Sequence, residues 1–257
     1  MNLHNNLYDL RKKMTKLYEA NNHILIHTGY GNPVMHRHMA AHIIISINGK
    51  MCVESDGVEY QCHGVMLPSG TLHSVNTYGK PALVFLYDCT TDIAKQIKTI
   101  SYVSGDCCQK IVESYTNFEN ACTSDDYRRF ERYVLAQLGF ASMSACVRDE
   151  RILSAMEYIR SMASENLSCK TVADTVCLSQ SRFSHLFKEQ VGMTFAAYLI
   201  YQRIMCVYAL LLQGKAITEA ALEAGFSSSA HFADVNRRIF GLPASTITCD
   251  LVFVKVH

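Results

Sequence analysis

The chain has 257 residues, enough for two domains that each bury a core of their own. Hydrophobic residues make up 49% and charged residues 18%, which excludes a disordered or low-complexity chain. The formal net charge is only +1, and residues 147–257 hold 11 Lys/Arg against 10 Asp/Glu. A uniformly basic nucleic-acid-binding domain is therefore excluded, and any contact with DNA must depend on where the basic residues lie.

Membrane and disulfide signals are weak. No run approaches 18 consecutive apolar residues, and Met1–Asn6 lack the basic-then-apolar pattern of a secretion signal. We expect a cytoplasmic protein without membrane contact, in which most of the eleven cysteines are small buried side chains. A thiol switch stays open as an alternative, with the adjacent pair Cys107 and Cys108 as its first candidates.

The N-terminal half is expected to be mainly β-structure after one short helix. Residues 7–18 carry apolar side chains at helical spacing with basic residues between them, which predicts an amphipathic helix. From His23 onward, short segments rich in β-formers are bounded by Asn-Gly, Asp-Gly and Pro-containing turns. This pattern predicts an antiparallel barrel or jelly roll. The expected strands are 23–27, 42–47, 51–54, 58–62, 64–67 and 82–87.

Two histidine-containing segments lie within this β-region. The first reads His36-Arg-His38-Met-Ala-Ala-His42, and the second, Pro68 to Asn76, contains His73. Both segments resemble the two motifs of the cupin family, whose metal sites take two His and a Glu from the first motif and one His from the second. His36, His38 and His73 match that pattern, and His42 occupies the position of the Glu.

These histidines leave two interpretations open. Neutral imidazoles suit Zn, Fe, Ni or Cu, so a divalent metal ion is one candidate occupant, held by His36, His38, His42 and His73. The other is a metal-free pocket in which the same side chains hydrogen-bond an organic effector, with Tyr60 and Tyr87 as aromatic lining. For each tyrosine, an ordinary place in the core is equally compatible with the sequence.

The second half of the chain is expected to be helical. Residues 92–139 show a 3.6-residue apolar period, interrupted by a polar break at 117–126. The Ala- and Ser-containing stretch 141–149 is the expected linker. A helix from Glu150 opens the next domain, which we place at 150–250. After it, the alternating tail Leu251–His257 is expected to form a strand and to add to a sheet edge or to a partner.

The stretch from Leu167 to Gly241 contains one pattern twice. Each copy has a short helix with a small residue, Ala173 or Ala221, and these alanines lie 48 positions apart. A tight turn follows, for which Gly225 supplies a positive φ in the second copy. A serine then sits where an N-cap is needed: Ser179 in the first copy, and Ser227 or Ser228 in the second. The pattern predicts two helix-turn-helix units, at about 167–192 and 216–241.

A helix over 194–212 is expected to join the two units. Its length of roughly 27 Å is comparable with one turn of B-DNA, about 34 Å, so the second helix of each unit can enter successive major grooves. In those second helices the apolar side chains face inward and the polar ones outward. The outward residues considered for DNA contact are Gln180, Ser181, Arg182, Ser184, His185, Lys188, Ser229, Ala230, His231, Arg237 and Arg238.

Residues from about 147 to 245 resemble the double helix-turn-helix domain of the AraC/XylS transcription regulators. The positions that carry the resemblance are Leu178, Ser179, Phe183, Leu186, Phe187, Gly192, Tyr198, Arg203, Ile217, Ala221, Gly225, Phe226, Phe232 and Gly241. The sequence departs from the family at Asn236, which replaces a core Phe, and at Val207, which replaces a small Ala. Asp234 is outward where a basic or polar residue is usual, and the aromatic residue and Arg that commonly follow Gly241 are missing.

The resemblance implies a fold and a function. It implies an α+β chain of two domains: a cupin-like antiparallel β-barrel with a helical dimerisation segment at 1–140, and an all-α double helix-turn-helix. It further implies a non-enzymatic homodimeric regulator that binds promoter DNA, senses a small-molecule effector and works with RNA polymerase. By residue-wise match, Ser181, Ser184 and His185 meet bases in one half-site, and Ser229, Ala230 and His231 in the other. The remaining candidates, Gln180, Arg182, Lys188, Arg237 and Arg238, contact phosphates.

Two alternatives to this function stay open. One is a cupin metalloenzyme, an isomerase or oxygenase, with an appended DNA-binding module. The other is a regulator that is controlled by a protein partner or by thiol oxidation, with a purely structural barrel.

Overall fold

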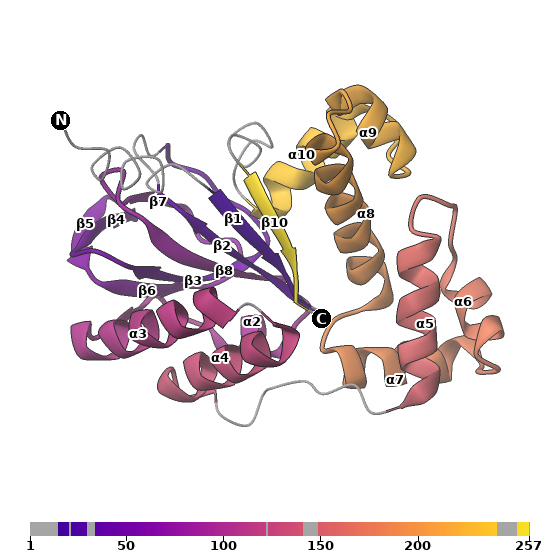
Figure 1. Ribbon diagram of the computed structural model, residues 1–257, viewed down its shortest axis with the longest axis horizontal. Coiled ribbons are helices and arrows are strands. Elements are labelled where there is room, and N and C mark those ends of the chain that lie inside the picture. Colours follow the sequence, from indigo (N-terminus) through magenta and orange to yellow (C-terminus); the bar gives the residue numbers. More distant parts are fainter. Residues whose placement is uncertain are drawn as a thin grey trace.

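The computed structural model describes residues 15–20, 22–29, 34–121, 123–140, 149–240 and 251–256. A sheet-rich N-terminal part and a helical C-terminal part lie side by side (Figure 1). The predicted α+β chain with two parts of different class is therefore confirmed.

The strands form two sheets. The larger has the order β10-β1-β2-β8-β3-β6-β9 and the smaller the order β5-β4-β7. Six expected strands are confirmed within one residue at each end, because alternating β-formers between tight turns leave little freedom in their limits. The strands are β1 Thr15–Glu19, β2 His23–Thr28, β3 Ala41–Ser46, β4 Met51–Ser55, β5 Val58–Cys62, β6 Gly64–Leu67, β7 His73–Asn76, β8 Ala82–Tyr87, β9 Ser101–Val103 and β10 Leu251–Lys255.

The two sheets remain separate within the described residues, so the expected closed barrel is not formed there. Each face of the larger sheet contributes to a different core. Ile43 and Ile45 pack with the helices that cover one face, whereas Ile44 between them packs with the smaller sheet and the C-terminal part. This alternation follows from the two-residue period of a strand.

The expectation of an N-terminal helix is wrong where the structure describes the segment, because Thr15–Glu19 form strand β1. Leu17 and Tyr18 are neighbours in the chain and both are buried, but they belong to the two different cores. Only an extended backbone can direct consecutive side chains to opposite faces. The rest of the predicted helix, before Thr15, lies outside the described residues.

The expected C-terminal strand is confirmed and joins the sheet of the N-terminal part. Strand β10 pairs in parallel with β1, from Thr15 opposite Leu251 to Glu19 opposite Lys255. The sheet is therefore mixed rather than purely antiparallel. In Figure 1 this yellow strand leaves the helical part and lies along the indigo edge strand. The tail consequently covers an edge that would otherwise present unpaired backbone groups.

The helices fall into two groups. The first group covers the outer face of the larger sheet and comprises α2 Asp92–Gln96, α3 Gly105–Ala121 and α4 Ser124–Gln137. The expected polar break is shorter than 117–126, because the Thr123 hydroxyl caps α4 by accepting from the Asp126 amide. The second group forms the C-terminal part: α5 Glu150–Ser161, α6 Cys169–Thr175, α7 Gln180–Val191, α8 Phe195–Leu212, α9 Ile217–Glu223 and α10 Ser229–Phe240.

Helix α8 is the longest apolar element of the described chain. By length and composition alone it would suffice to cross a membrane, but half of it is buried inside the protein. Its buried side chains include Tyr198, Ile204 and Val207, which form the centre of the C-terminal core. The apolar character of α8 is thus explained by its place in that core.

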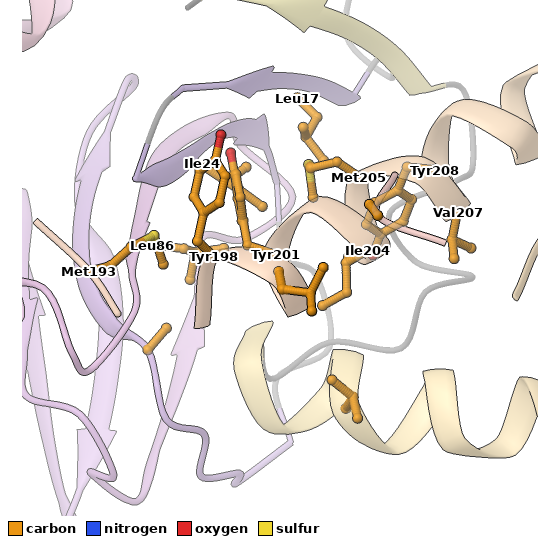
Figure 2. Close-up of a cluster of buried hydrophobic side chains, with 14 of the residues drawn as sticks. Leu17, Ile24, Leu86, Met193, Tyr198, Tyr201, Ile204, Met205, Val207 and Tyr208 are labelled. Atoms are coloured by element: carbon orange, nitrogen blue, oxygen red, sulfur yellow. The ribbon is translucent and has the colours of Figure 1, made fainter. Parts of the chain in front are cut away.

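One continuous core joins the N-terminal and C-terminal parts. Tyr198 and Tyr201 of α8 reach towards Ile24 and Leu86 of the larger sheet (Figure 2). The Tyr201 hydroxyl lies 2.7 Å from the backbone oxygen of Ala20 and 3.0 Å from that of His23, and it donates to them from a buried position. Because these polar groups are paired where water is excluded, the helical domain is held in a defined orientation against the sheet.

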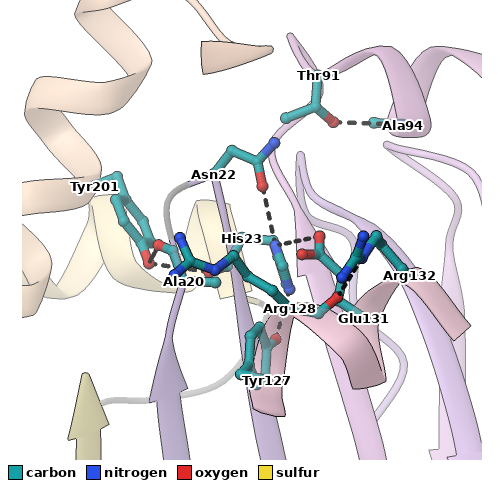
Figure 3. Close-up of polar contacts among 10 residues, drawn as sticks. All are labelled: Ala20, Asn22, His23, Thr91, Ala94, Tyr127, Arg128, Glu131, Arg132 and Tyr201. Carbon is teal, nitrogen blue, oxygen red and sulfur yellow. Dashed lines mark hydrogen bonds and ion pairs between the residues drawn. The ribbon is translucent and has the colours of Figure 1, made fainter. Parts of the chain in front are cut away.

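His23 connects this interface to α4. Its Nδ1 donates to Asn22 Oδ1 at 3.0 Å, and its Nε2 accepts from the Tyr127 hydroxyl at 2.6 Å (Figure 3). Glu131 lies beside it, with 3.5 Å between Oε1 and Nδ1. Burial lowers the pKa of His23 to about 3 and raises that of Glu131 to about 7. The network therefore favours neutral forms of both groups near neutral pH.

Candidate functional site

The first helix-turn-helix unit consists of α6 and α7. The Ser179 hydroxyl accepts from the Arg182 amide at 3.3 Å and so caps α7, as expected. Phe183 and Phe187 are fully buried, which fixes the inner face of α7. The helix ends at Gly192, whose φ of 81° is left-handed.

The outer face of α7 presents the expected polar residues to solvent. Ser184 additionally contacts α6, with 3.2 Å between its Oγ and Cys169 Sγ. All of the candidates on this helix are exposed: Gln180, Ser181, Arg182, Ser184, His185 and Lys188. This face can donate and accept hydrogen bonds over nearly three helical turns.

The second unit consists of α9 and α10. Gly225 has the expected positive φ, 86°, and a Cβ there would lie 2.6 Å from the backbone oxygen of Ser164. Any other residue would therefore meet both backbone strain and a collision. Of the two N-cap candidates, Ser228 is the one whose hydroxyl accepts from the His231 amide, at 3.0 Å. Ser227 instead hydrogen-bonds with the His231 ring, with 2.9 Å between Oγ and Nδ1.

The outer face of α10 is also polar. Ala230, His231, Arg237 and Arg238 are exposed, and Ser229 is half-buried with its hydroxyl 3.5 Å from that of Thr218. The Ser227 contact holds the His231 ring near the start of the helix. The two units thus each present one solvent-facing helix with hydrogen-bonding and basic side chains.

Cys177 is a feature of the first turn that sequence reasoning missed. It adopts a φ of 54°, and it lies 48 positions before Gly225, at the same place in the repeat. The repeat spacing is the signal that could have revealed it. Both turns thus use the same left-handed backbone, with a non-glycine residue in the first.

Helix α8 is fixed to both units. Arg203 donates to the backbone oxygens of Ala163 and Glu165, both at 2.8 Å, and so binds the segment after α5. At the other unit, the fully buried Asn236 accepts from the Tyr208 hydroxyl at 2.7 Å. The departure from the family at Asn236 is thus compensated by a polar partner on α8. Val207 is fully buried, and Asp234 is exposed.

The four histidines of the N-terminal part come together as a cluster at the start of β3. The ring centroids lie 4.0 Å apart for His38 and His42 and 4.6 Å apart for His36 and His73. The potential ligand nitrogens of His36, His38 and His73 all lie within 4.8 Å of one another, and His42 stands beside this set of three.

The cluster is buried and short of hydrogen bonds. His38, His42 and His73 are at most 4% exposed. Both ring nitrogens of His38 and His42, and Nε2 of His73, have no hydrogen-bond partner among the described residues. Burial, together with the neighbouring histidines, lowers the pKa of His38 to about 3 and that of His42 well below its usual value. Neutral imidazoles with free lone pairs are the form that binds a metal ion, so these residues fit one.

The two predicted tyrosines do not belong to this cluster. Tyr60 is 44% exposed on β5 and lies against Tyr102, with ring centroids 5.0 Å apart. Tyr87 is fully buried and stacks on His23 at 4.7 Å. The structure does not bring either tyrosine together with the four histidines, and Tyr87 occupies a place in the core.

A pocket that the sequence did not indicate lies between the larger sheet and α3. It has a volume of about 430 Å³ and is lined partly by Ser46, His63, Cys108 and Glu113. Of the two thiol-switch candidates, Cys108 lines this pocket; burial raises the pKa of Cys108 to about 12 and also raises that of Cys107. Neither thiol is therefore activated, since reactivity requires the thiolate.

Comparisons with known proteins agree with this geometry. A family model described as a helix-turn-helix domain matches residues 172–248. The arabinose operon regulatory protein of Escherichia coli is 33% identical over 99 residues, which cover 38% of this chain and 34% of that protein. The thermoregulatory protein LcrF of Yersinia pestis is 41% identical over 64 residues, 24% of each chain.

The chain spans about a third of the length of the first of these relatives. Among solved structures, ToxT from Vibrio cholerae is similar over 88% of this chain and 97% of its own, with 12% identity and a TM-score of 0.47. The residues that the family model matches contain the end of α6 and all of α7, α8, α9 and α10. Residues 172–248 are thus similar to a helix-turn-helix domain, and a stretch of 99 residues is similar to part of a known transcription regulator.

Proposed function

We propose that the chain is a transcription regulator that binds promoter DNA through α7 and α10. The observation that carries this function is the pair of exposed polar helix faces, each on an equivalent unit and both attached to one rigid helix. The 18 residues of α8 span roughly 27 Å, which suits successive major grooves on one side of the duplex.

On both helices, some side chains contact DNA bases and others contact the DNA backbone. Ser181, Ser184 and His185 read base edges in one half-site, and Ser229, Ala230 and His231 do so in the other. The other outward side chains contact phosphates, which set position without reading sequence. These are Gln180, Arg182, Lys188, Arg237 and Arg238. Because the domain is nearly neutral overall, nonspecific affinity is modest and falls steeply with salt.

The N-terminal part is the regulatory half of this proposal. A cupin-like domain, covering residues 1–140, takes a small-molecule effector, and α3 and α4 form the dimerisation surface. The linker at 141–149 connects it to the DNA-binding domain at 150–250; residues 141–148 and 241–250 lie outside the described residues. The proposed protein is a cytoplasmic homodimer that acts on RNA polymerase and has no enzymatic activity.

Selection of duplexes from a random pool tests the proposal. The purified chain should enrich sequences with two conserved half-sites, and His185→Ala should relax preference at one base pair at a cost of about 1–3 kcal/mol. Lys188→Ala is the matched control on the same helix. It should weaken binding to all duplexes alike, and the slope of log affinity against log salt concentration should become shallower by about one. An unchanged selected motif for His185→Ala would remove His185 from base reading, and no enrichment at all would reject the function.

The histidine cluster also suits the metalloenzyme alternative. That alternative is an isomerase or oxygenase, and a metal bound by His36, His38 and His73 is what it requires.

A further inference from the structure

The imidazole of His231 is held by its neighbours at the start of α10. The backbone amide of Ser227 donates to His231 Nδ1 at 3.4 Å, and the Ser227 hydroxyl lies 2.9 Å from the same nitrogen. The ring also meets the Phe226 ring edge to face, with centroids 5.4 Å apart and 82° between the planes. Phe226 is buried, so it is a fixed support. The orientation of the His231 ring is therefore determined within the protein.

The Ser227 amide also determines which ring nitrogen carries the hydrogen. A backbone N–H can only donate, so Nδ1 must be the nitrogen with the free lone pair. The Ser227 hydroxyl then donates to Nδ1 as well. In a neutral imidazole whose Nδ1 accepts, the hydrogen is on Nε2. His231 is thus fixed as a donor through Nε2, and the described residues supply no hydrogen-bond partner for that nitrogen.

The Nε2 donor lies at the end of α10 that is suited to base contact. His231 is the third residue of α10, its amide donates to the capping hydroxyl of Ser228, and its side chain is exposed. Residues at the N-terminal end of a recognition helix are the ones that contact base edges in the major groove. Because Nδ1 is directed back towards Ser227, Nε2 is the ring nitrogen that remains for DNA.

The histidine on α7 has no such restraint. His185 is exposed, and its ring has no hydrogen-bond partner among the residues that the structure describes. Its imidazole is therefore free to carry the hydrogen on either nitrogen and to donate or accept. The chain thus contains an internal reference for a histidine whose tautomer is not fixed.

We propose that Ser227 positions His231 as a hydrogen-bond donor that reads guanine in the half-site contacted by α10, an inference that rests on the function proposed above. In the major groove guanine presents two adjacent acceptors, N7 and O6. Thymine presents one acceptor beside its methyl group, adenine one acceptor beside an amino donor, and cytosine only a donor. A ring that donates through Nε2 therefore binds guanine best and is opposed by the amino group of cytosine. Ser227 acts only through His231, as a positioning residue.

Nitrogen NMR of the isotope-labelled full chain measures the tautomer without DNA. At about pH 8.5, where imidazoles are ordinarily neutral, His231 should show the Nε2–H form alone, whereas His185 should show both forms in exchange. Ser227→Ala, an exposed change, removes the closer donor and should give His231 a measurable Nδ1–H fraction. Ser161→Ala, at the exposed end of α5, is the matched control and should leave His231 unchanged. Hydrogen on Nδ1 of His231 in the native chain would overturn the fixed donor.

Selection of duplexes then measures the base that is read. The native chain should prefer guanine over cytosine by about 5-fold or more at one position of the half-site, the low end of the range for one base contact. His231→Ala should abolish this preference, and Ser227→Ala should reduce it. His231→Asn should shift the preference to adenine, since Asn pairs with adenine N6 and N7.

Equal weakening on all duplexes in His231→Ala would indicate a phosphate contact and overturn the base reading. A guanine preference that is unchanged in Ser227→Ala would remove Ser227 as the positioning residue. Failure of the native chain to bind any duplex would reject the regulator function and the base reading together, and the tautomer measurement would stand by itself.

Discussion

The buried pair of Tyr208 and Asn236 should stabilise the second helix-turn-helix unit measurably. Tyr208→Phe removes the hydroxyl and leaves the Asn236 oxygen without that donor in a site that is fully buried. An unsatisfied buried polar group costs about 1–3 kcal/mol, so the free energy of unfolding should fall by that amount. Asn236→Leu should cost a similar amount, because the Tyr208 hydroxyl then loses its acceptor.

The double variant distinguishes this pairing from a general effect of packing. With both partners apolar, neither end of this hydrogen bond is left unsatisfied, so the two losses should not add fully, and the coupling energy should be about 1–2 kcal/mol. The assay is urea unfolding, in which the dependence of the unfolding free energy on urea concentration should be the same for all variants. Asp234→Asn, an exposed change on the same helix, is the control and should stay within about 0.5 kcal/mol. Strictly additive losses in the double variant would refute the compensation that we assign to this pair.

Three further predictions concern the N-terminal part and its interface. Glu131 keeps its proton up to about pH 7 in the native state, whereas the unfolded chain loses it near pH 4.5, so stability falls as pH rises through that window. Glu131→Gln should remove up to about 3 kcal/mol of this pH-dependent loss of stability. The effect is smaller if water screens the Glu131 side chain, which is 15% exposed. Equal pH profiles for the variant and the native chain would contradict a raised pKa of Glu131. Tyr201→Phe should lower stability by about 1–3 kcal/mol in urea, because the Ala20 carbonyl loses the Tyr201 donor and the His23 carbonyl keeps only the Ala20 amide; no change would mean that water replaces the hydroxyl. A chain ending at Asp250 should lose hydrogen-exchange protection in β1, whereas full protection would show that β10 does not cover that edge.

Strands bounded by strong turns could be predicted closely from the sequence. β5 and β8 match their expected limits because Asp56-Gly57 and Gly79-Lys80-Pro81 turns precede them. The three residues of β9 carry too short a pattern to be recognised. The sequence predicts a helix at β1 because the apolar residues there also fit a helical period. Only its pairing with β2 and β10 decides between the two.

The histidine cluster was predictable and its surroundings were not. Spacing within the two motifs identified the histidines, but the position of Tyr87 depends on register across the sheet. His42 is opposite Leu86, and Ala41 is opposite Tyr87, so the Tyr87 side chain belongs to the helix-covered face and His42 to the other. A shift of one residue in this pairing would exchange the two, and nothing in the sequence of a single strand specifies it. The hydrogen bond from the Met39 amide to the Arg238 backbone oxygen likewise joins residues 199 positions apart and has no local signature.

The proposed function depends most on α7 and α10 contacting the same side of one DNA duplex. The direct measurement is the affinity of the chain for a selected duplex into which base pairs are inserted between the half-sites. Five inserted base pairs turn one half-site to the opposite side, since a turn of B-DNA takes about 10.5 base pairs. We predict that this insertion weakens binding to the level of a single half-site and that His231→Ala then has no further effect. Unchanged affinity after the insertion would contradict the rigid pairing of α7 and α10.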